Sequence, residues 1–349
     1  MTTTTSSGIR DRFDLSPTVL IWLALVLVLV VGGIIVSADG GNLFAQSNVV
    51  NLLSRTSVLG FVALGQTLVI LCRSLDLSVG FTAALASIVG ATVMDGDPGR
   101  IVLGVAAALA VSAVIGLVNG VVIARLDVNP FIATLGMGLI IKGYLDTRYA
   151  GPVGAVPPAF QDFGYTRIWV VPVATVVMLL VALASGLLLG RTRAGHAMYA
   201  VGGNTDAARL SGIRTDRTIV LSHVLCAVAA GLAGLLLAAR FSTGVGAQIY
   251  SAGYDLESIA AVVGGTLLMG GRGGVSGTVA GVLILATLDS VFNLLQVDPF
   301  FRDVLRGVII ITAVAIYARR QIDASSLRQR FTRTGAPRTA DAVGREVAS

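Results

Sequence analysis

Long apolar segments recur along the chain and are separated by short polar stretches. The first of them, residues 18–38, contains no charged side chain. A helix needs roughly 20 mostly apolar residues to cross the hydrocarbon core of a bilayer. By this criterion we predict about ten spans, at residues 18–38, 57–72, 78–94, 101–124, 130–147, 168–190, 218–239, 255–270, 276–296 and 303–318. The chain is therefore expected to be an all-α polytopic membrane protein.

Two spans and one flanking segment depart from the simple pattern. Residues 57–72 and 255–270 are each shorter than the ~17 residues that a crossing helix needs, so we expect them to be steeply packed or re-entrant. Residues 43–55 mix Gln, Asn and Arg with Leu and Val. This mixture predicts a surface helix that lies at the membrane interface ahead of the second span.

The apolar runs define one membrane domain, residues 18–318, with a polar segment at each end. Segment 1–17 precedes the domain, and the Arg-rich tail 319–349 is expected to be disordered. Basic residues favour the cytoplasmic side of a membrane. Placing both ends in the cytoplasm puts most of the 25 Lys and Arg residues on that side, including those of loop 190–217, which is long enough for short helices.

Composition supports this interpretation. Hydrophobic residues make up 55% of the chain and charged residues 13%, about half of the ~25% that is usual in soluble domains. This excludes both a soluble domain and a disordered chain. The net charge of +6 would suit nucleic acid, but the arginines lie mainly in loops, so we expect no nucleic-acid partner.

Glycine is abundant, with 42 residues. Small residues let helices approach closely in lipid. The Gly-x-x-x-Gly pairs therefore predict tight packing inside the bundle, with a dimer seam as the alternative. These pairs are Gly116–Gly120, Gly186–Gly190 and Gly277–Gly281.

Residue types that commonly serve in catalysis or metal binding are scarce in this chain. The two cysteines and two histidines are scattered, so we predict no metal site. The tetrad at 274–277 has the Gly-x-Ser-Gly form of intramembrane serine proteases, but His223 precedes Ser276, which is the wrong order for that class. The single lysine, Lys142, follows an isoleucine, so the chain lacks a phosphate-binding loop. We predict that the chain is not an enzyme and binds no cofactor, and that any ATP is hydrolysed by another polypeptide.

Polar residues within or beside the spans are the candidates for a translocation pathway. Each of them is equally suited to an interhelical hydrogen bond. They are Gln66, Asn119, Asn129, Thr134, Asp289 and Asn293. Lys142 and Asp146 stand four residues apart and are expected to pair on one helix face.

Four polar residues lie at predicted helix starts. Asp76 and Ser78 are expected to cap the span that begins at 78. Asp255 and Glu257 are expected to do so for the span that begins at 255, where acidic groups also complement the helix dipole. A gating role for these four residues is the alternative.

Seven segments, in order along the chain, carry a family resemblance. They are GQTLVIL at 65–71, LDLSVG at 75–80, PFIATLG at 130–136, YAVGGN at 199–204, AARLSGI at 207–213, IAAVVGGT at 259–266 and GGRG at 270–273. Together they resemble the membrane permease subunits of bacterial ATP-binding-cassette importers. The resemblance is to the branch that serves ribose, xylose, galactose and related sugars, and branched-chain amino acid permeases belong to the same broader family.

The resemblance implies a type II importer fold that moves a monosaccharide inward by alternating access. Its implied partners are two cytoplasmic ATPases, a second permease copy or paralogue, and an extracytoplasmic sugar-binding protein. It also implies that loop 199–213 docks on the ATPase. The implied coupling residues are Ala200, Gly202, Gly203, Asn204, Asp206, Ala207, Ala208, Arg209 and Gly212. An ion-coupled carrier and a permease for branched-chain amino acids are the alternatives.

The sequence departs from the family pattern at two places and echoes itself at two others. Arg73 and Ser74 stand where two glycines are common, and Gly195-His196 replaces a glycine–arginine pair. LDVNPF at 126–131 resembles LQVDPF at 295–300, which suits an inverted repeat. A second pair of similar segments, Gly65-x-Thr-Leu and Gly264-x-Thr-Leu, would instead place the two copies in the same orientation across the membrane. The sequence therefore does not decide whether the chain contains an inverted repeat.

Overall fold

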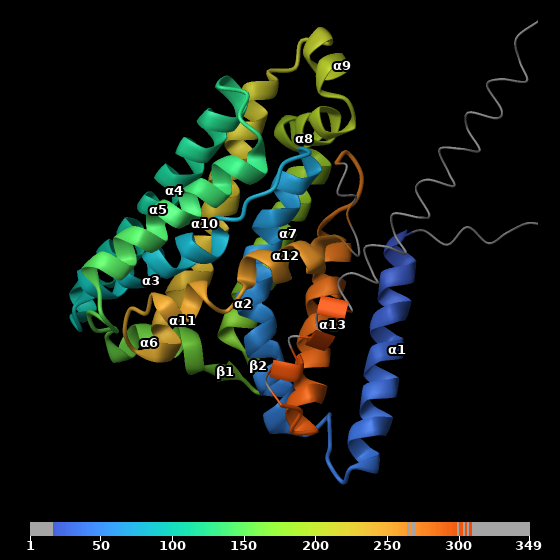
Figure 1. Ribbon diagram of the computed structural model, residues 1–349. Helices are drawn as coiled ribbons and strands as arrows, with labels where there is room; N and C mark the ends of the chain where they lie inside the picture. Colours follow the sequence, from blue (N-terminus) through green and yellow to red (C-terminus); the bar gives the residue numbers. More distant parts are fainter. Residues whose placement is uncertain are drawn as a thin grey trace, which may run out of the picture. The chain divides into compact units, whose positions relative to one another are not determined.

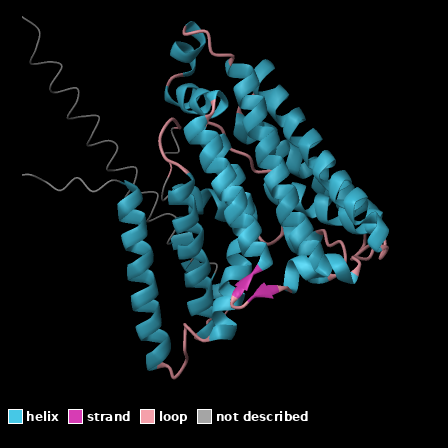
Figure 2. Ribbon diagram, turned by 180° about the vertical axis from the view of Figure 1, so that it is seen from behind, coloured by secondary structure: helices cyan, strands magenta, loops and turns pink. Residues whose placement is uncertain are grey.

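The computed structural model describes residues 17–263, 266, 270–298, 300–302, 304–305 and 307–308, so most of the predicted span 303–318 lies outside the described residues. Most of the described chain is helical (Figure 1, Figure 2). In this part of the chain, six helices are long and apolar enough to cross a membrane. They are α1 (Pro17–Ala38), α2 (Gln46–Leu71), α4 (Ile101–Arg125), α7 (Val173–Arg191), α10 (Thr215–Phe241) and α13 (Val275–Leu294).

Shorter or more polar elements connect these helices. They are α3 (Val79–Met94), the 3-10 turn η1 (Pro98–Arg100), α5 (Pro130–Arg148), α6 (Pro158–Tyr165), α8 (Arg193–Gly203), α9 (Thr205–Leu210), α11 (Ala247–Tyr250) and α12 (Tyr254–Val263). One antiparallel hairpin joins β1 (Arg167–Ile168) to β2 (Val171–Pro172). The predicted all-α fold is confirmed, and loop 190–217 contains the two short helices α8 and α9.

Helices α2 and α10 form the centre of the bundle. Helix α10 packs against α4, α2 and α3, and α2 also contacts α7, α12 and α13. Every residue of α2 from Thr56 to Leu71 is buried, as expected for a helix that is apolar on all sides. The largest hydrophobic cluster joins α2, α3 and α10 through side chains such as Phe61, Ile88 and Leu236.

Helices α1, α4 and α7 lie at the periphery. In each of them 28% of the most apolar stretch is buried, against 83% in α2. Their exposed side chains are large and apolar, among them Leu27 and Ile34 of α1, Val102 of α4 and Leu183 of α7. These surfaces are suited to contact with acyl chains, because hydrocarbon imposes no penalty on exposed apolar groups.

The predicted interfacial helix at 43–55 is wrong, because residues 46–71 form one continuous helix, α2. Polar side chains near the start of α2 find hydrogen-bond partners while the helix stays continuous. Thr56 donates to the carbonyl of Leu52, and Ser290 of α13 donates to Asn48 Oδ1, both at 2.8 Å. The 26 residues of α2 extend about 39 Å, so the segment predicted as a short span at 57–72 belongs to a helix long enough to cross.

Two other predicted boundaries need correction. Helix α7 begins at Val173 rather than 168, because residues 167–172 form the β1–β2 hairpin, with Trp169 at a left-handed φ of 60°. Helix α12 is described as Tyr254–Val263, and neither Thr266 nor Gly270 is helical, so the predicted span 255–270 is not one continuous helix; its residues 264, 265 and 267–269 lie outside the described residues. Ten residues of helix extend about 15 Å, half of the ~30 Å hydrocarbon core. Helix α12 alone therefore does not span the membrane.

The glycine pairs differ in what surrounds them. A Cβ on Gly116 would lie 2.4 Å from the carbonyl oxygen of His223, and one on Gly120 would lie 2.6 Å from Val220 Cα. This confirms packing inside the bundle for the first pair, between α4 and α10. A Cβ on Gly281 would lie 2.0 Å from the Ala261 carbonyl oxygen, so α13 and α12 pack equally closely. Among the described residues, by contrast, nothing lies within 4 Å of the Cβ position of Gly186 in α7, so this part of the chain shows no close packing at that glycine.

We expect Gly116→Ala to lower the stability of the protein by about 1–3 kcal/mol, because the added methyl forces α4 away from the α10 backbone. The readout is the apparent melting temperature of the detergent-solubilised chain. Gly186→Ala is the matched control. It should leave melting unchanged or raise it slightly, because alanine is the better helix former by ~1 kcal/mol. Equal melting of the two variants would contradict the close α4–α10 contact.

The two similar segments at 126–131 and 295–300 also resemble each other in structure. Asp127 and Gln296 both have a left-handed φ, at 54° and 51°. Two residues after each, a side-chain oxygen accepts a backbone N–H across a turn at 2.9 Å, from Phe131 to Asn129 and from Phe300 to Asp298. The two copies therefore share a local turn geometry.

Candidate functional site

A non-helical segment, residues 72–78, links α2 to α3 through the buried interior. Irregular backbone at membrane depth is tolerated only where protein groups satisfy it. Here Leu77 donates its N–H to Thr134 Oγ1 of α5 at 3.1 Å. The amide of Gln66, with its nitrogen toward the Asp76 carbonyl and its oxygen toward the Asp76 N–H, makes two hydrogen bonds of 3.3 Å. Side chains from α2 and α5 thus replace the missing helical bonds.

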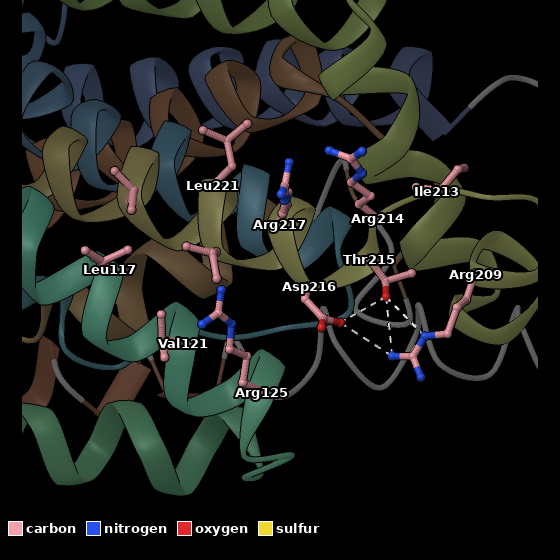
Figure 3. Close-up of a pocket in the computed structure, with 12 residues that line it drawn as sticks. Leu117, Val121, Arg125, Arg209, Ile213, Arg214, Thr215, Asp216, Arg217 and Leu221 are labelled. Atoms are coloured by element: carbon pink, nitrogen blue, oxygen red, sulfur yellow. Dashed lines mark hydrogen bonds and ion pairs between the residues drawn. The ribbon is translucent and has the colours of Figure 1, made fainter.

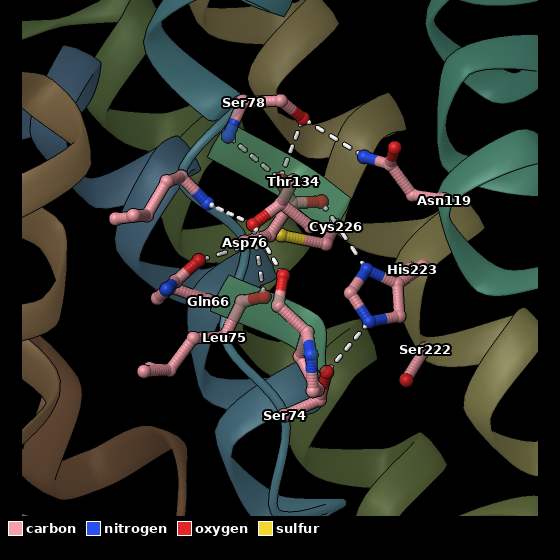
Figure 4. A network of polar contacts seen from close by, with 12 residues as sticks. Gln66, Ser74, Leu75, Asp76, Ser78, Asn119, Thr134, Ser222, His223 and Cys226 are labelled. Atoms are coloured by element: carbon pink, nitrogen blue, oxygen red, sulfur yellow. Dashed lines mark hydrogen bonds and ion pairs between the residues drawn. The ribbon is translucent and has the colours of Figure 1, made fainter. Parts of the chain in front are cut away.

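The carboxylate of Asp76 is the centre of a buried polar network (Figure 4). Its Oδ1 accepts the backbone N–H of Ser78 at 2.9 Å and the Ser78 hydroxyl at 2.6 Å. Its Oδ2 lies 3.3 Å from His223 Nδ1 of α10. Asn119 of α4 donates to Ser78 Oγ at 3.0 Å. The network therefore ties the 72–78 segment to α10 and α4.

The far side of His223 contacts Ser74, with 2.8 Å between Nε2 and Oγ. Nδ1 of His223 therefore faces the carboxylate of Asp76, and Nε2 of the same ring faces the Ser74 hydroxyl. This order of groups is that of a serine hydrolase triad. Ser74 is 4% exposed, however, and Asp76 and His223 are fully buried, so in this structure the hydroxyl does not open onto the surface. The three side chains act as a bridge between the 72–78 segment and α10.

Ser276, the serine of the protease-like tetrad, lies elsewhere. Its hydroxyl accepts a hydrogen bond from Trp22 Nε1 of α1 at 3.1 Å. Its contact is with the peripheral helix α1 rather than with His223.

The structure brings together three of the six predicted pathway residues. Gln66, Asn119 and Thr134 meet around the 72–78 segment, and all three are buried. Asn129 instead caps α5. Asp289 and Asn293 lie on α13, where Asn293 Oδ1 accepts from Arg302 Nη1 at 3.2 Å. The pathway role of the six stays a prediction, and for the buried three the contacts favour structural hydrogen bonding.

The capping prediction for α3 is wrong in its detail. Ser78 occupies the N-cap position, but its side chain makes no cap hydrogen bond. Its hydroxyl turns back to Asp76 instead, because the buried carboxylate is the stronger acceptor. Asp255 and Glu257 lie in the first turn of α12 as expected. The predicted pair of Lys142 and Asp146 is confirmed at 2.6 Å.

Sequence reasoning missed Ser74 and His223 as members of the network. Both carried a signal: Ser74 replaces a glycine common in the family, and His223 is a polar side chain within an otherwise apolar run. The neighbouring Arg73 has a left-handed φ of 59°, a conformation that favours glycine. The backbone therefore explains why glycine suits that position.

The second structural feature is the α8–α9 arm, residues 193–210, at one end of the bundle (Figure 1). Asn204 separates the two helices and caps α9, accepting the N–H of Ala207 at 3.0 Å. Ala208 is buried, whereas Leu210 is 90% exposed. Gly212 closes α9 with a φ of +83°. The predicted coupling residues thus form a compact arm with an exposed apolar tip.

The base of the arm fits tightly against two other segments. A Cβ on Gly202 would lie 1.7 Å from the Leu71 carbonyl oxygen, at the end of α2, and 2.5 Å from Gly271 N. Gly271 donates its N–H to the same Leu71 carbonyl at 3.0 Å. Burial raises the pKa of Tyr199, so its hydroxyl stays protonated and donates to the Gly273 carbonyl at 2.9 Å. The arm, the end of α2 and the turn that leads to α13 meet at one point.

Comparisons with known proteins agree with this architecture. The sequence profile of the family described as branched-chain amino acid transport system / permease component matches residues 48–314. The ribose import permease protein RbsC of Escherichia coli (strain K12) is 40% identical over 92% of this chain and 100% of its own length. RbsC of Bacillus subtilis (strain 168) is 37% identical over 81% of this chain and 88% of its own.

A galactose relative and the solved structures complete the comparison. The galactose/methyl galactoside import permease protein MglC of Haemophilus influenzae is 33% identical over 89% of this chain and 98% of its own. No solved structure matches the chain. With a family profile that covers most of the sequence and relatives that align from end to end, the chain belongs to the family of branched-chain amino acid transport system permease components.

Proposed function

We propose that this chain is the membrane permease subunit of an ATP-binding-cassette importer that moves a monosaccharide into the cytoplasm by alternating access. The relatives that align over nearly their whole length are ribose and galactose import permeases. Ribose is the first sugar to test, because the ribose relatives reach 40% identity.

The observation that carries the proposal is the α8–α9 arm. Its exposed tip, Leu210, offers a docking point, and its base at Gly202 contacts both α2 and the turn before α13. A push on α9 would therefore move two transmembrane helices. In this proposal the tip docks on a separate ATPase, both termini lie in the cytoplasm, and the membrane is the cytoplasmic membrane. Two ATPases, a second permease and a sugar-binding protein complete the importer.

Reconstitution tests the function. The chain is co-expressed with a candidate ATP-binding-cassette ATPase and a candidate sugar-binding protein, and uptake of labelled ribose, galactose and leucine into proteoliposomes is measured. We expect ATP-dependent uptake of one sugar and none of leucine. Uptake that runs without the ATPase and collapses with an uncoupler while ATP persists would overturn the proposal in favour of an ion-coupled carrier.

A charge reversal on α9 tests the coupling role. We expect Asp206→Lys with Arg209→Glu to abolish sugar uptake while membrane insertion stays intact, because the charge at each of these two positions on α9 is reversed. Arg209 also pairs with Asp216 at 3.5 Å, so Asp216→Asn is the control that breaks this internal contact without altering α9. It should retain uptake. Normal uptake by the double variant would count against the arm as the coupling element.

A further inference from the structure

We propose that the groove between α4 and the start of α10 is a binding site for an anionic phospholipid. The groove has a volume of about 550 Å³ and is lined by α4, by the 209–214 segment and by the first turns of α10 (Figure 3). Its lining divides into a basic end and an apolar remainder. This inference is independent of the transported solute.

Four arginines form the basic end: Arg125 of α4, and Arg209, Arg214 and Arg217 from the chain that enters α10. Arg209 is engaged by Asp216, the one acidic residue of the lining. Among the residues that the structure describes, Arg125, Arg214 and Arg217 form no ion pair. Three arginines that line one groove without an ion-pair partner favour the binding of an anion, and planar guanidinium groups match phosphate oxygens.

The start of α10 strengthens this preference for an anion. Arg214 occupies the N-cap position of α10, and Arg217 lies in its first turn. A helix N-terminus already carries about half a positive charge, and Asp216 is the one acidic residue in this first turn, so the two arginines and the helix dipole together exceed its charge. Arg125, at the end of α4, faces the same groove (Figure 3). A bound phosphate would offset the repulsion among these groups.

The remainder of the lining is apolar. Leu117 and Val121 of α4 face Leu221 and Val224 of α10 across the groove, and Leu117 and Leu221 are 47% and 37% exposed. Leu117 precedes Arg125 by eight residues, about 12 Å along the helix. The groove thus runs from the helix ends, at headgroup depth, into the hydrocarbon region. A basic pocket between transmembrane helices with such an apolar extension fits a lipid headgroup and its acyl chain.

Because the lining has a basic end and an apolar part, it favours one class of ligand over the others. A free phosphate or nucleotide would use only the arginines and leave the leucines unoccupied. A cytoplasmic protein would not reach a groove wall about two helical turns inside the span. An anionic phospholipid matches both parts at once.

Native mass spectrometry of the purified full-length chain tests the site, with phosphatidylglycerol and phosphatidylcholine of identical acyl chains as probes. We expect wild type to prefer phosphatidylglycerol. Arg125→Gln/Arg214→Gln/Arg217→Gln should weaken its binding about a hundredfold, at roughly a factor of five for each basic residue. The triple lysine variant at the same positions should retain the preference, and millimolar inorganic phosphate should not displace the lipid.

The control removes the same number of charges elsewhere. Arg148→Gln/Arg191→Gln/Arg193→Gln replaces three exposed arginines outside the groove and should leave the preference unchanged. Equal binding of the two lipids, an unchanged preference in the glutamine variant, or an equal loss in the control would overturn the proposal. Displacement by phosphate would assign the site to free anions. Loss of ATPase binding with an unchanged lipid preference would assign it to the partner.

Discussion

Replacing Gly202 by alanine is expected to abolish ATP-driven uptake. The added methyl would lie 1.7 Å from the Leu71 carbonyl oxygen and 2.5 Å from Gly271 N, and both are backbone atoms that no rotamer change can move. The arm must therefore separate from the end of α2 and from the 270–273 turn. Overpacking of this kind costs about 1–3 kcal/mol, and here it falls on the contact through which α9 would act. The measurement is ATP-dependent sugar uptake in proteoliposomes.

The adjacent residue provides the control. Gly203 belongs to the same helix, but no described residue lies within 4 Å of its Cβ position. Gly203→Ala should therefore support uptake close to wild type. Measuring ATP hydrolysis alongside uptake separates two outcomes. A Gly202→Ala complex that still binds the ATPase but no longer transports sugar places the defect in transmission through the arm. Full uptake by Gly202→Ala would contradict that role.

The sequence locates the long apolar helices of the described residues, such as α1, α4, α10 and α13, because hydropathy and length together describe what a bilayer demands. Helix α3 ends where Asp95 and Gly96 adopt positive φ, and α5 begins at Pro130, where proline suits the first turn. The error at 43–55 has a tertiary cause. The polarity of that segment is real, but Asn48 is satisfied by Ser290, which lies 242 residues away on α13. No local pattern contains such a contact.

The candidate site shows the same limit. Polarity alone selected Gln66, Asn119 and Thr134, and the fold does bring these three together around the 72–78 segment. Polarity could not separate them from Asn129, whose oxygen caps a helix. Nor could it join Ser74 to His223, which are 149 residues apart and linked by one hydrogen bond. Which polar side chains meet in space depends on how the helices pack, and the periodic pattern of hydrophobic residues does not encode this packing.

Removing the carboxylate of Asp76 is expected to have the largest effect on stability. Asp76→Ala deprives the Ser78 N–H, the Ser78 hydroxyl and the His223 ring of their acceptor. All three groups are buried, so water cannot replace the lost bonds. Breaking a buried pair in this way costs about 3–5 kcal/mol. The apparent melting temperature and the yield of folded protein from membranes should fall sharply.

A double-mutant cycle identifies the cause. If His223 bridges the 72–78 segment to α10, then His223→Ala alone should also destabilise the protein. Asp76→Ala/His223→Ala should then lose less than the sum of the single variants, because each removes the interaction that the other would lose. Asp162→Ala, at an exposed aspartate of α6, controls for loss of a carboxylate and should melt as wild type. Strict additivity of the two buried substitutions would show that Asp76 and His223 contribute separately. The 72–78 segment would then be held by Gln66 and Thr134 rather than by the bridge to α10.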